Sequence, residues 1–249
     1  VPQLHEIQCT GGEPFISEQF IKLLKYIIET GHAGHIELEI TTNGTKFVAD
    51  VMELLTHFKH TRFLISIDGS GSAYDYIRAP YTYKLLLQRL QFLNEYIESG
   101  KISASVEIPV LAMVYNLFSI SQLEHDIKDS LRVAQTDAGQ FVQITPMLNE
   151  GEDRLLIKWL PKEILIEALH DYMQIDNQHR LSGKDSYNFD WIRMLISYIR
   201  DDVDEHIAAT KHRELKNYTL LMDKILNRDY HDFLHPHIAD FLDTIESDL

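Results

Sequence analysis

The stretch HEIQCTGGEPFISEQFIKLLKYIIETGHAGHIELEITTNG, residues 5–44, carries the pattern that decides the fold. The short apolar segment 5–9 predicts a strand, and the glycine-rich turn 11–14 follows it directly. Ser17 can cap a helix whose apolar residues recur at helical spacing, and the alternating segment 35–42 predicts the next strand. Strand, helix and strand in this order are typical of a βαβ unit with parallel strands.

The same unit recurs through the first 150 residues. Asn43-Gly44 is a hairpin signal by itself, but the apolar residues that follow repeat at helical spacing, so a helix is expected at 47–58. Five strands alternating with helices predict an α/β fold with a parallel, partial (β/α) barrel-like sheet. Beyond the first two strands, strands are expected at 63–67, 102–114 and 141–147, and helices at 83–97 and 117–127.

The strand signal disappears after Pro161, and the last hundred residues favour helices. We therefore expect two domains, a barrel-like core over residues 1–150 and a helical C-terminal extension over residues 151–249. The expected helices of the extension are 162–173, 191–199, 215–226 and 238–245.

Charge and hydropathy narrow the class of protein. The chain of 249 residues has a net charge of −15, with 38 acidic and 23 basic residues, which disfavours binding to nucleic-acid phosphates. No apolar run approaches the roughly 20 residues of a membrane helix. The segment after Val1 shows no basic stretch followed by an apolar one, which is the pattern of a signal peptide. We expect a cytoplasmic protein that binds neither membranes nor, in general, nucleic acid.

Cysteine and histidine content limits the metal chemistry. The one cysteine, Cys9, excludes an internal disulfide and a self-contained zinc or iron–sulfur site built on several thiolates. We expect Cys9 to be a small core residue. The 13 histidines show no spacing typical of a metal motif, so no metal ligand is assigned.

The ligand site is expected where the carboxyl ends of the parallel strands meet. Two glycines, Gly11 and Gly12, allow a backbone to approach a ligand closely, and Pro14 stiffens the turn into the helix. The Glu13 carboxylate can accept hydrogen bonds from a ligand ammonium. A plain strand–helix turn is the alternative.

Together these segments resemble the radical S-adenosylmethionine (AdoMet) superfamily over residues 5–150. The Gly-Gly-Glu-Pro turn resembles its AdoMet-binding motif, and the segments after the next two strands appear in the same order. They read ITTNGT at residues 40–45, LISIDG at 64–69 and YDYIR at 74–78. Residues 149–150, 159–163 and 235–242 resemble the narrower twitch-domain group of that superfamily.

The resemblance implies roles for eight residues. The turn formed by Gly11, Gly12, Glu13 and Pro14 corresponds to the motif that binds the methionyl amino group of AdoMet. Ser66 and Arg78 match positions that hold its carboxylate or ribose, and an arginine fork suits a carboxylate. Asn43 and Asp68 match polar positions near the ribose. Two alternatives stay open: Arg78 as a surface ion pair and Asp68 as a turn cap.

The resemblance also implies an activity. Radical AdoMet enzymes cleave AdoMet reductively, and the 5′-deoxyadenosyl radical abstracts hydrogen from a substrate, here an unidentified small molecule or peptide. The electron would come from a donor such as flavodoxin or ferredoxin. No catalytic residue is assigned.

This sequence departs from the family pattern in one respect. The family holds its [4Fe–4S] cluster with Cys-x3-Cys-x2-Cys after the first strand, and this sequence starts at what corresponds to the second. A cluster is therefore expected only with cysteines outside this sequence, and the chain alone should be inactive. One alternative is a non-catalytic AdoMet-binding or scaffold protein without the cluster motif. Another is an unrelated α/β barrel enzyme for an amine or phosphate ligand.

Overall fold

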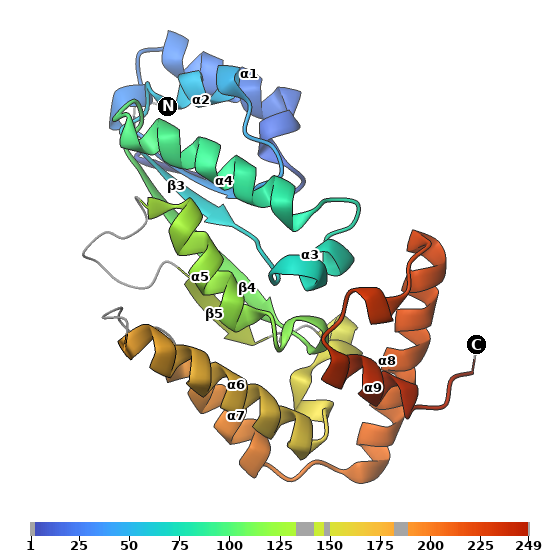
Figure 1. Cartoon of the computed structure of the whole chain (residues 1–249). Coiled ribbons are helices and arrows are strands. Elements are labelled where there is room, and N and C mark those ends of the chain that lie inside the picture. Colours follow the sequence, from blue (N-terminus) through green and yellow to red (C-terminus); the bar gives the residue numbers. More distant parts are fainter. Residues whose placement is uncertain (1–2, 133–141, 147–149, 182–188, 249) are drawn as a thin grey trace. The chain divides into compact units, whose positions relative to one another are not determined.

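The computed structural model describes residues 3–132, 142–146, 150–181 and 189–248 (Figure 1). This part of the chain contains one five-stranded sheet with the strand order β1-β2-β3-β4-β5. Its first four strands are parallel neighbours, as expected for right-handed βαβ crossovers. The strands are β1 (Glu6–Cys9), β2 (Glu37–Thr42), β3 (His60–Ile65), β4 (Ala104–Ala112) and β5 (Val142–Pro146).

The strand order explains why the sheet is barrel-like. Each strand pairs with the next strand along the chain, whereas a doubly wound sheet reverses its order at a switch point. Sequential order without reversal is the arrangement within a (β/α) barrel. The predicted α/β fold with a partial barrel and a helical C-terminal region is therefore confirmed.

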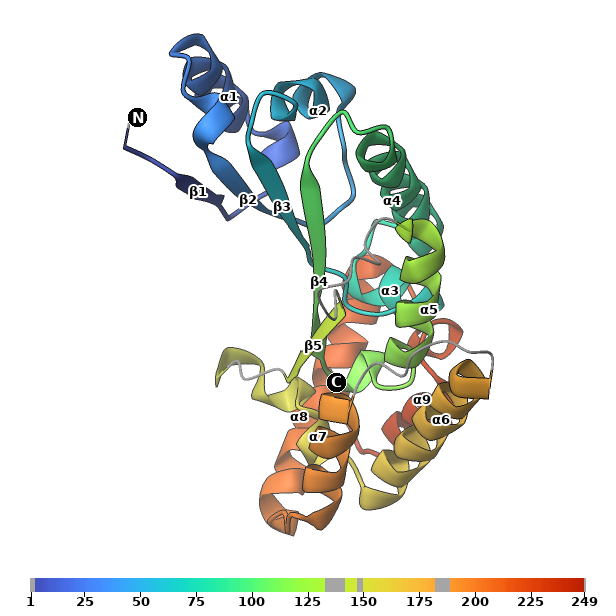
Figure 2. The same cartoon turned by 90° about the vertical axis from the view of Figure 1, so that its left-hand side faces the viewer.

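Three helices cover one face of β1–β3 (Figure 2). They are α1 (Glu18–Glu29), α2 (Ala49–Leu55) and α4 (Tyr83–Glu98). Alternate residues of the strands are buried under them, including Ile40 and Phe63, each with none of its surface exposed. The opposite face is polar, and Arg62 there donates to Glu39 and Glu107, at 2.7 Å each.

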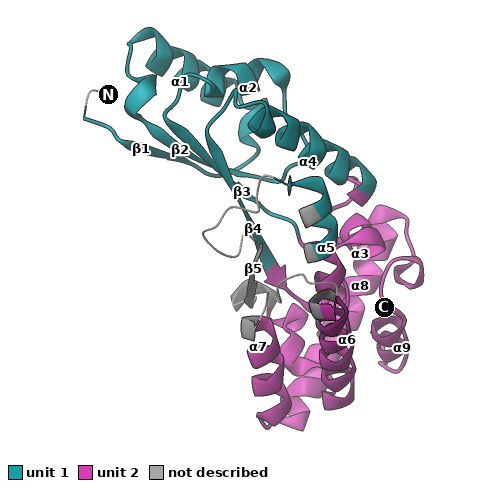
Figure 3. Ribbon diagram, turned by 60° about the vertical axis from the view of Figure 1, so that its left-hand side comes forward, with its two compact units in different colours: residues 1–67, 84–110, 124–143 teal, residues 68–83, 111–123, 144–249 magenta. Residues whose placement is uncertain are grey.

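The chain divides into two compact units (Figure 3). Unit 1 comprises residues 1–67, 84–110 and 124–143, and unit 2 comprises residues 68–83, 111–123 and 144–249. The chain thus leaves unit 1 shortly after β3 and again within β4. The expected boundary at residue 150 stays a prediction.

Unit 2 is mainly helical. Three of the four helices expected after residue 161 are longer than predicted, and the last, expected at 238–245, lies two residues earlier. The helix α8 begins at Glu205, ten residues before the apolar pattern that predicted it, because Asp204 caps it by accepting from the N–H groups of His206 and Ile207. No helix was expected between the strand 63–67 and the helix 83–97, but the segment Gly71–Ile77 forms the helix α3. The other helices are α6 (Lys162–Leu181), α7 (Phe189–Arg200) and α9 (Pro236–Asp243), and α5 (Ile120–Ser130) belongs to both units.

Candidate functional site

The turn after β1 presents bare backbone. Gly11 and Gly12 have φ angles of 87° and 61°, in the left-handed region that favours glycine. Both residues are exposed, and a Cβ atom built on either would meet no atom of the described residues within 4 Å. Within that part of the chain, the space beside the two glycines is therefore open.

The side chain of Glu13 joins this turn to the turn after β2. Its Oε1 accepts a hydrogen bond from the Thr42 hydroxyl at 2.7 Å and from the Phe15 N–H at 3.3 Å. Its Oε2 accepts from the Asn43 N–H at 3.0 Å. Pro14 is buried and opens the 3₁₀ turn η1 (Pro14–Ile16), which leads into α1.

Glu13 still has capacity for a ligand. A carboxylate oxygen can accept two hydrogen bonds, and Oε2 accepts one within the described residues. In the same part of the chain no cationic side chain pairs with Glu13. A negative charge without a nearby cation favours an ammonium ligand.

The turn after β2 is held by its own side chains. Asn43 Oδ1 accepts from the N–H and the hydroxyl of Thr45, at 3.0 and 2.6 Å. At Gly44, where φ is 69°, a Cβ atom would lie 2.7 Å from Ile65 of β3, so a side chain does not fit. The half-buried Ser66 follows β3, and its N–H donates to Thr42 O at 2.9 Å.

Six of the eight predicted site residues therefore lie at one edge of unit 1. The side chain of Glu13 and the backbone of Thr42 connect the ends of β1, β2 and β3, as expected for the carboxyl edge of a parallel sheet. These residues are Gly11, Gly12, Glu13, Pro14, Asn43 and Ser66.

The other two predicted residues, Asp68 and Arg78, pair with each other within unit 2. Asp68 Oδ2 accepts a short hydrogen bond from Arg78 Nη2, and its Oδ1 accepts from the Leu111 N–H at 3.3 Å. The two side chains are 8% and 29% exposed, so this is a largely buried pair rather than a surface one. Arg78 Nε is buried and has no partner among the described residues. One N–H of the fork is therefore available to an acceptor.

Residues 1–112 match the sequence model described as the radical SAM superfamily. This segment belongs to that superfamily. All eight predicted site residues fall within it. A search of curated protein sequences gave no match.

Solved structures resemble the chain over part of their length. One, described as native anSMEcpe with bound AdoMet, has 14% sequence identity and a TM-score of 0.46. A second, of the same protein with AdoMet and Cp18Cys peptide, has 13% identity and a TM-score of 0.44. Each alignment covers 73% of this chain and 49% of the other, so this chain spans about half the length of those proteins.

The radical SAM segment does not contain the residues for a [4Fe–4S] cluster. Cys9, at the end of β1, is the one thiol of the chain, and it is half-buried rather than fully in the core. Burial raises its pKa, which disfavours the thiolate that binds metal. Within the described residues no group of three or more His, Cys, Asp or Glu side chains is arranged to hold a metal ion.

Sequence reasoning missed Thr42, which links Glu13 to β2 within the radical SAM segment. The alternation of β2 was a usable signal, because it places Thr42 on the face covered by helices, where it is 2% exposed. A buried hydroxyl needs a hydrogen-bond partner, and the nearest predicted polar turn carries Glu13.

In the part of the chain that the structure describes, none of the helices has an apolar stretch of the length that a membrane span requires.

Proposed function

We propose that the radical SAM segment binds AdoMet, with the turn after β1 receiving its methionyl amino group. The observation that carries the proposal is the open turn of Gly11 and Gly12 beside the carboxylate of Glu13. Backbone carbonyls of the turn and the remaining lone pair of Glu13 Oε2 suit an ammonium donor. Separately, the Nε of Arg78 in unit 2 has no partner among the described residues, and a guanidinium N–H suits a carboxylate.

We further propose that the whole protein cleaves AdoMet reductively. One electron from a donor such as reduced flavodoxin or ferredoxin would break the bond between sulfur and the 5′ carbon, giving methionine and a 5′-deoxyadenosyl radical. That radical would take a hydrogen atom from a small molecule or a peptide. The proposal rests on superfamily membership; the residues of this chain bind and orient AdoMet, and cysteines outside this sequence would have to hold the cluster.

AdoMet binding can be tested with a pair of glycine variants. A methyl group at Gly12 would enter the open space of the turn, so we expect Gly12→Ala to weaken AdoMet binding by about tenfold or more in calorimetric titrations. Gly100→Ala is the control, because Gly100 also has a positive φ, 70°, and open space around it, but lies far along the chain after α4. Equal effects of the two variants would contradict the assigned site.

Activity is a separate test. The protein from the complete reading frame, reconstituted with iron and sulfide without oxygen and supplied with reductant, should form 5′-deoxyadenosine from AdoMet. AdoMet binding without formation of 5′-deoxyadenosine would favour the non-catalytic binding protein. Failure to bind AdoMet would contradict both.

A further inference from the structure

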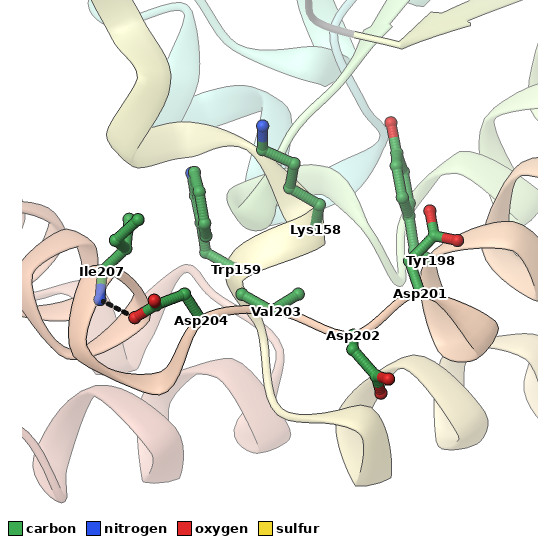
Figure 4. Close-up of a pocket in the computed structure, with 8 residues that line it drawn as sticks. All are labelled: Lys158, Trp159, Tyr198, Asp201, Asp202, Val203, Asp204 and Ile207. Atoms are coloured by element: carbon green, nitrogen blue, oxygen red, sulfur yellow. Dashed lines mark hydrogen bonds between the residues drawn. The ribbon is translucent and has the colours of Figure 1, made fainter.

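Unit 2 contains a cavity outside the radical SAM segment, between the 3₁₀ turn η6 (Ile157–Trp159) and the loop that joins α7 to α8 (Figure 4). Its volume is about 270 Å³, near the lower limit for ligand pockets and suited to a group the size of one side chain. The lining residues are Lys158, Trp159, Tyr198, Asp201, Asp202, Val203, Asp204 and Ile207.

Two aromatic rings form opposite walls of this cavity. Figure 4 shows the rings of Trp159 and Tyr198 on either side, with Val203 between them. The indole is held in place because its Nε1 donates to Asp153 O at 2.8 Å. Burial, together with the nearby Asp201 carboxylate, raises the pKa of Tyr198, so its hydroxyl stays neutral. Neutral aromatic faces attract cations.

The charges around the cavity favour a positive ligand. Three carboxylates and one ammonium line it, which gives a net charge of −2. Asp204 is engaged as the cap of α8, and the fully exposed Asp202 lies 3.4 Å from Lys162. In Figure 4 Asp202 points away from the rings, whereas Asp201 lies beside Tyr198. In the described part of the chain Asp201 has no ion-pair partner, which leaves its carboxylate for a ligand.

The protein already places one ammonium group against the aromatic wall. Lys158 Nζ lies 4.4 Å from the centre of the Trp159 ring. This contact demonstrates that the indole face accepts an alkylammonium group at contact distance. It also means that an external cation must share the wall with Lys158.

We propose that this cavity binds an alkylammonium or alkylguanidinium group, with its methylene chain over Val203 and its charge between the two rings and Asp201. The group can belong to a free amine or to a lysine or arginine side chain of a peptide. This inference is independent of AdoMet binding, since none of the lining residues belongs to the radical SAM segment.

Tryptophan fluorescence can report the binding. The chain has two tryptophans, and Trp191 is 2% exposed, so a ligand in the cavity should change the emission of Trp159. We expect saturable binding of n-pentylamine and no comparable binding of 1-pentanol, which has the same chain without the charge. A short peptide with one lysine and a blocked amino terminus provides the second arm. Tighter binding of the peptide than of pentylamine assigns the site to a side chain, and the reverse assigns it to a free amine.

Three variants identify the residues. Asp201→Asn should weaken pentylamine binding by about fivefold to tenfold, whereas Asp202→Asn, in the same loop, should weaken it by less than about twofold because its carboxylate points away from the rings. Lys158→Met keeps the stem but removes the competing charge, and should tighten binding. Equal binding of pentanol, equal effects of the two Asn variants, or no binding of either cationic probe would overturn the proposal.

Discussion

At the scale of single residues, the main result concerns Glu13. Its carboxylate accepts hydrogen bonds from three groups of the protein, two of them at the end of β2 and the turn that follows. A glutamate that was expected to serve a ligand therefore also holds the turns after β1 and β2 together. Stability and the proposed binding of AdoMet therefore depend on the same side chain.

This double role predicts the effect of Glu13→Gln. The amide NH₂ of glutamine cannot accept, so at least one of the three donors loses its partner, and the free energy of unfolding should fall by about 1–3 kcal/mol. Urea denaturation monitored by circular dichroism gives this value. The matched control is Glu18→Gln on α1. The Glu18 side chain is 81% exposed and lies 3.5 Å from Lys22, so this variant should change the free energy of unfolding by less than about 0.5 kcal/mol. Similar losses in the two variants would mean that Glu13 does not join the turns.

At the scale of elements, the end of unit 2 is held by a titratable link. His231 lies in the 3₁₀ turn η7 (Tyr230–Asp232), and its ring nitrogens bond to Asp229 at 2.6 Å and to Asp243 of α9 at 2.9 Å. Hydrogen bonds to these carboxylates raise the pKa of His231. Hydrogen bonds from His231 and from Tyr230 lower the pKa values of Asp229 and Asp243 respectively.

The signs define a pH window for this link. A raised folded pKa means that the stabilisation by His231 is fully present below its unfolded value of about 6.5 and is lost as the pH rises through the folded value. The lowered pKa values of the aspartates add stability above their ordinary value of about 3.8, which is lost in acid.

We therefore expect His231→Gln to be less stable than the wild type mainly between about pH 4 and pH 6.5. The difference should be on the order of a few tenths of a kcal/mol, because all three side chains are about half exposed, and it should shrink in high salt. Unfolding at several pH values measures it. A difference that grows as the pH rises would contradict the assignment.

At the scale of the whole molecule, the two units interleave along the chain. The segments 68–83 and 111–123 precede residue 150 but belong to unit 2. Within that unit, the Tyr115 hydroxyl lies 2.7 Å from Thr219 Oγ1 on α8, and the Tyr76 hydroxyl donates to Asp223 at 2.8 Å. The helix α8 thus depends on residues encoded far upstream.

This arrangement predicts that the fragment 151–249 does not fold on its own. Without Tyr76 and Tyr115, the fully buried Thr219 and its neighbours on α8 would face water. We expect a broad, non-cooperative thermal transition by circular dichroism, in contrast to the full chain. A cooperative transition at the midpoint of the full chain would instead show that residue 150 is a true domain boundary.

The alternation of strands and helices could be predicted from the sequence, because hydrophobic periodicity depends on which face of each element is buried. The sequence also placed Gly11–Pro14, Asn43 and Ser66 at strand ends, because the carboxyl ends of parallel strands share one edge. The sequence pattern did not predict α3, because this helix begins with glycine and its seven residues are too few to show a helical period.

The pairing of side chains could not be predicted from the sequence and is seen in the three-dimensional structure. Glu13 meets a hydroxyl 29 residues away, Arg78 bonds to Asp68 instead of standing free, and Trp159 faces Tyr198 across a cavity. Periodicity reports the burial of each position, whereas such contacts depend on how elements distant in the sequence pack in space. The local pattern therefore located the Gly-Gly-Glu-Pro turn, and the packing determined what Glu13 does there.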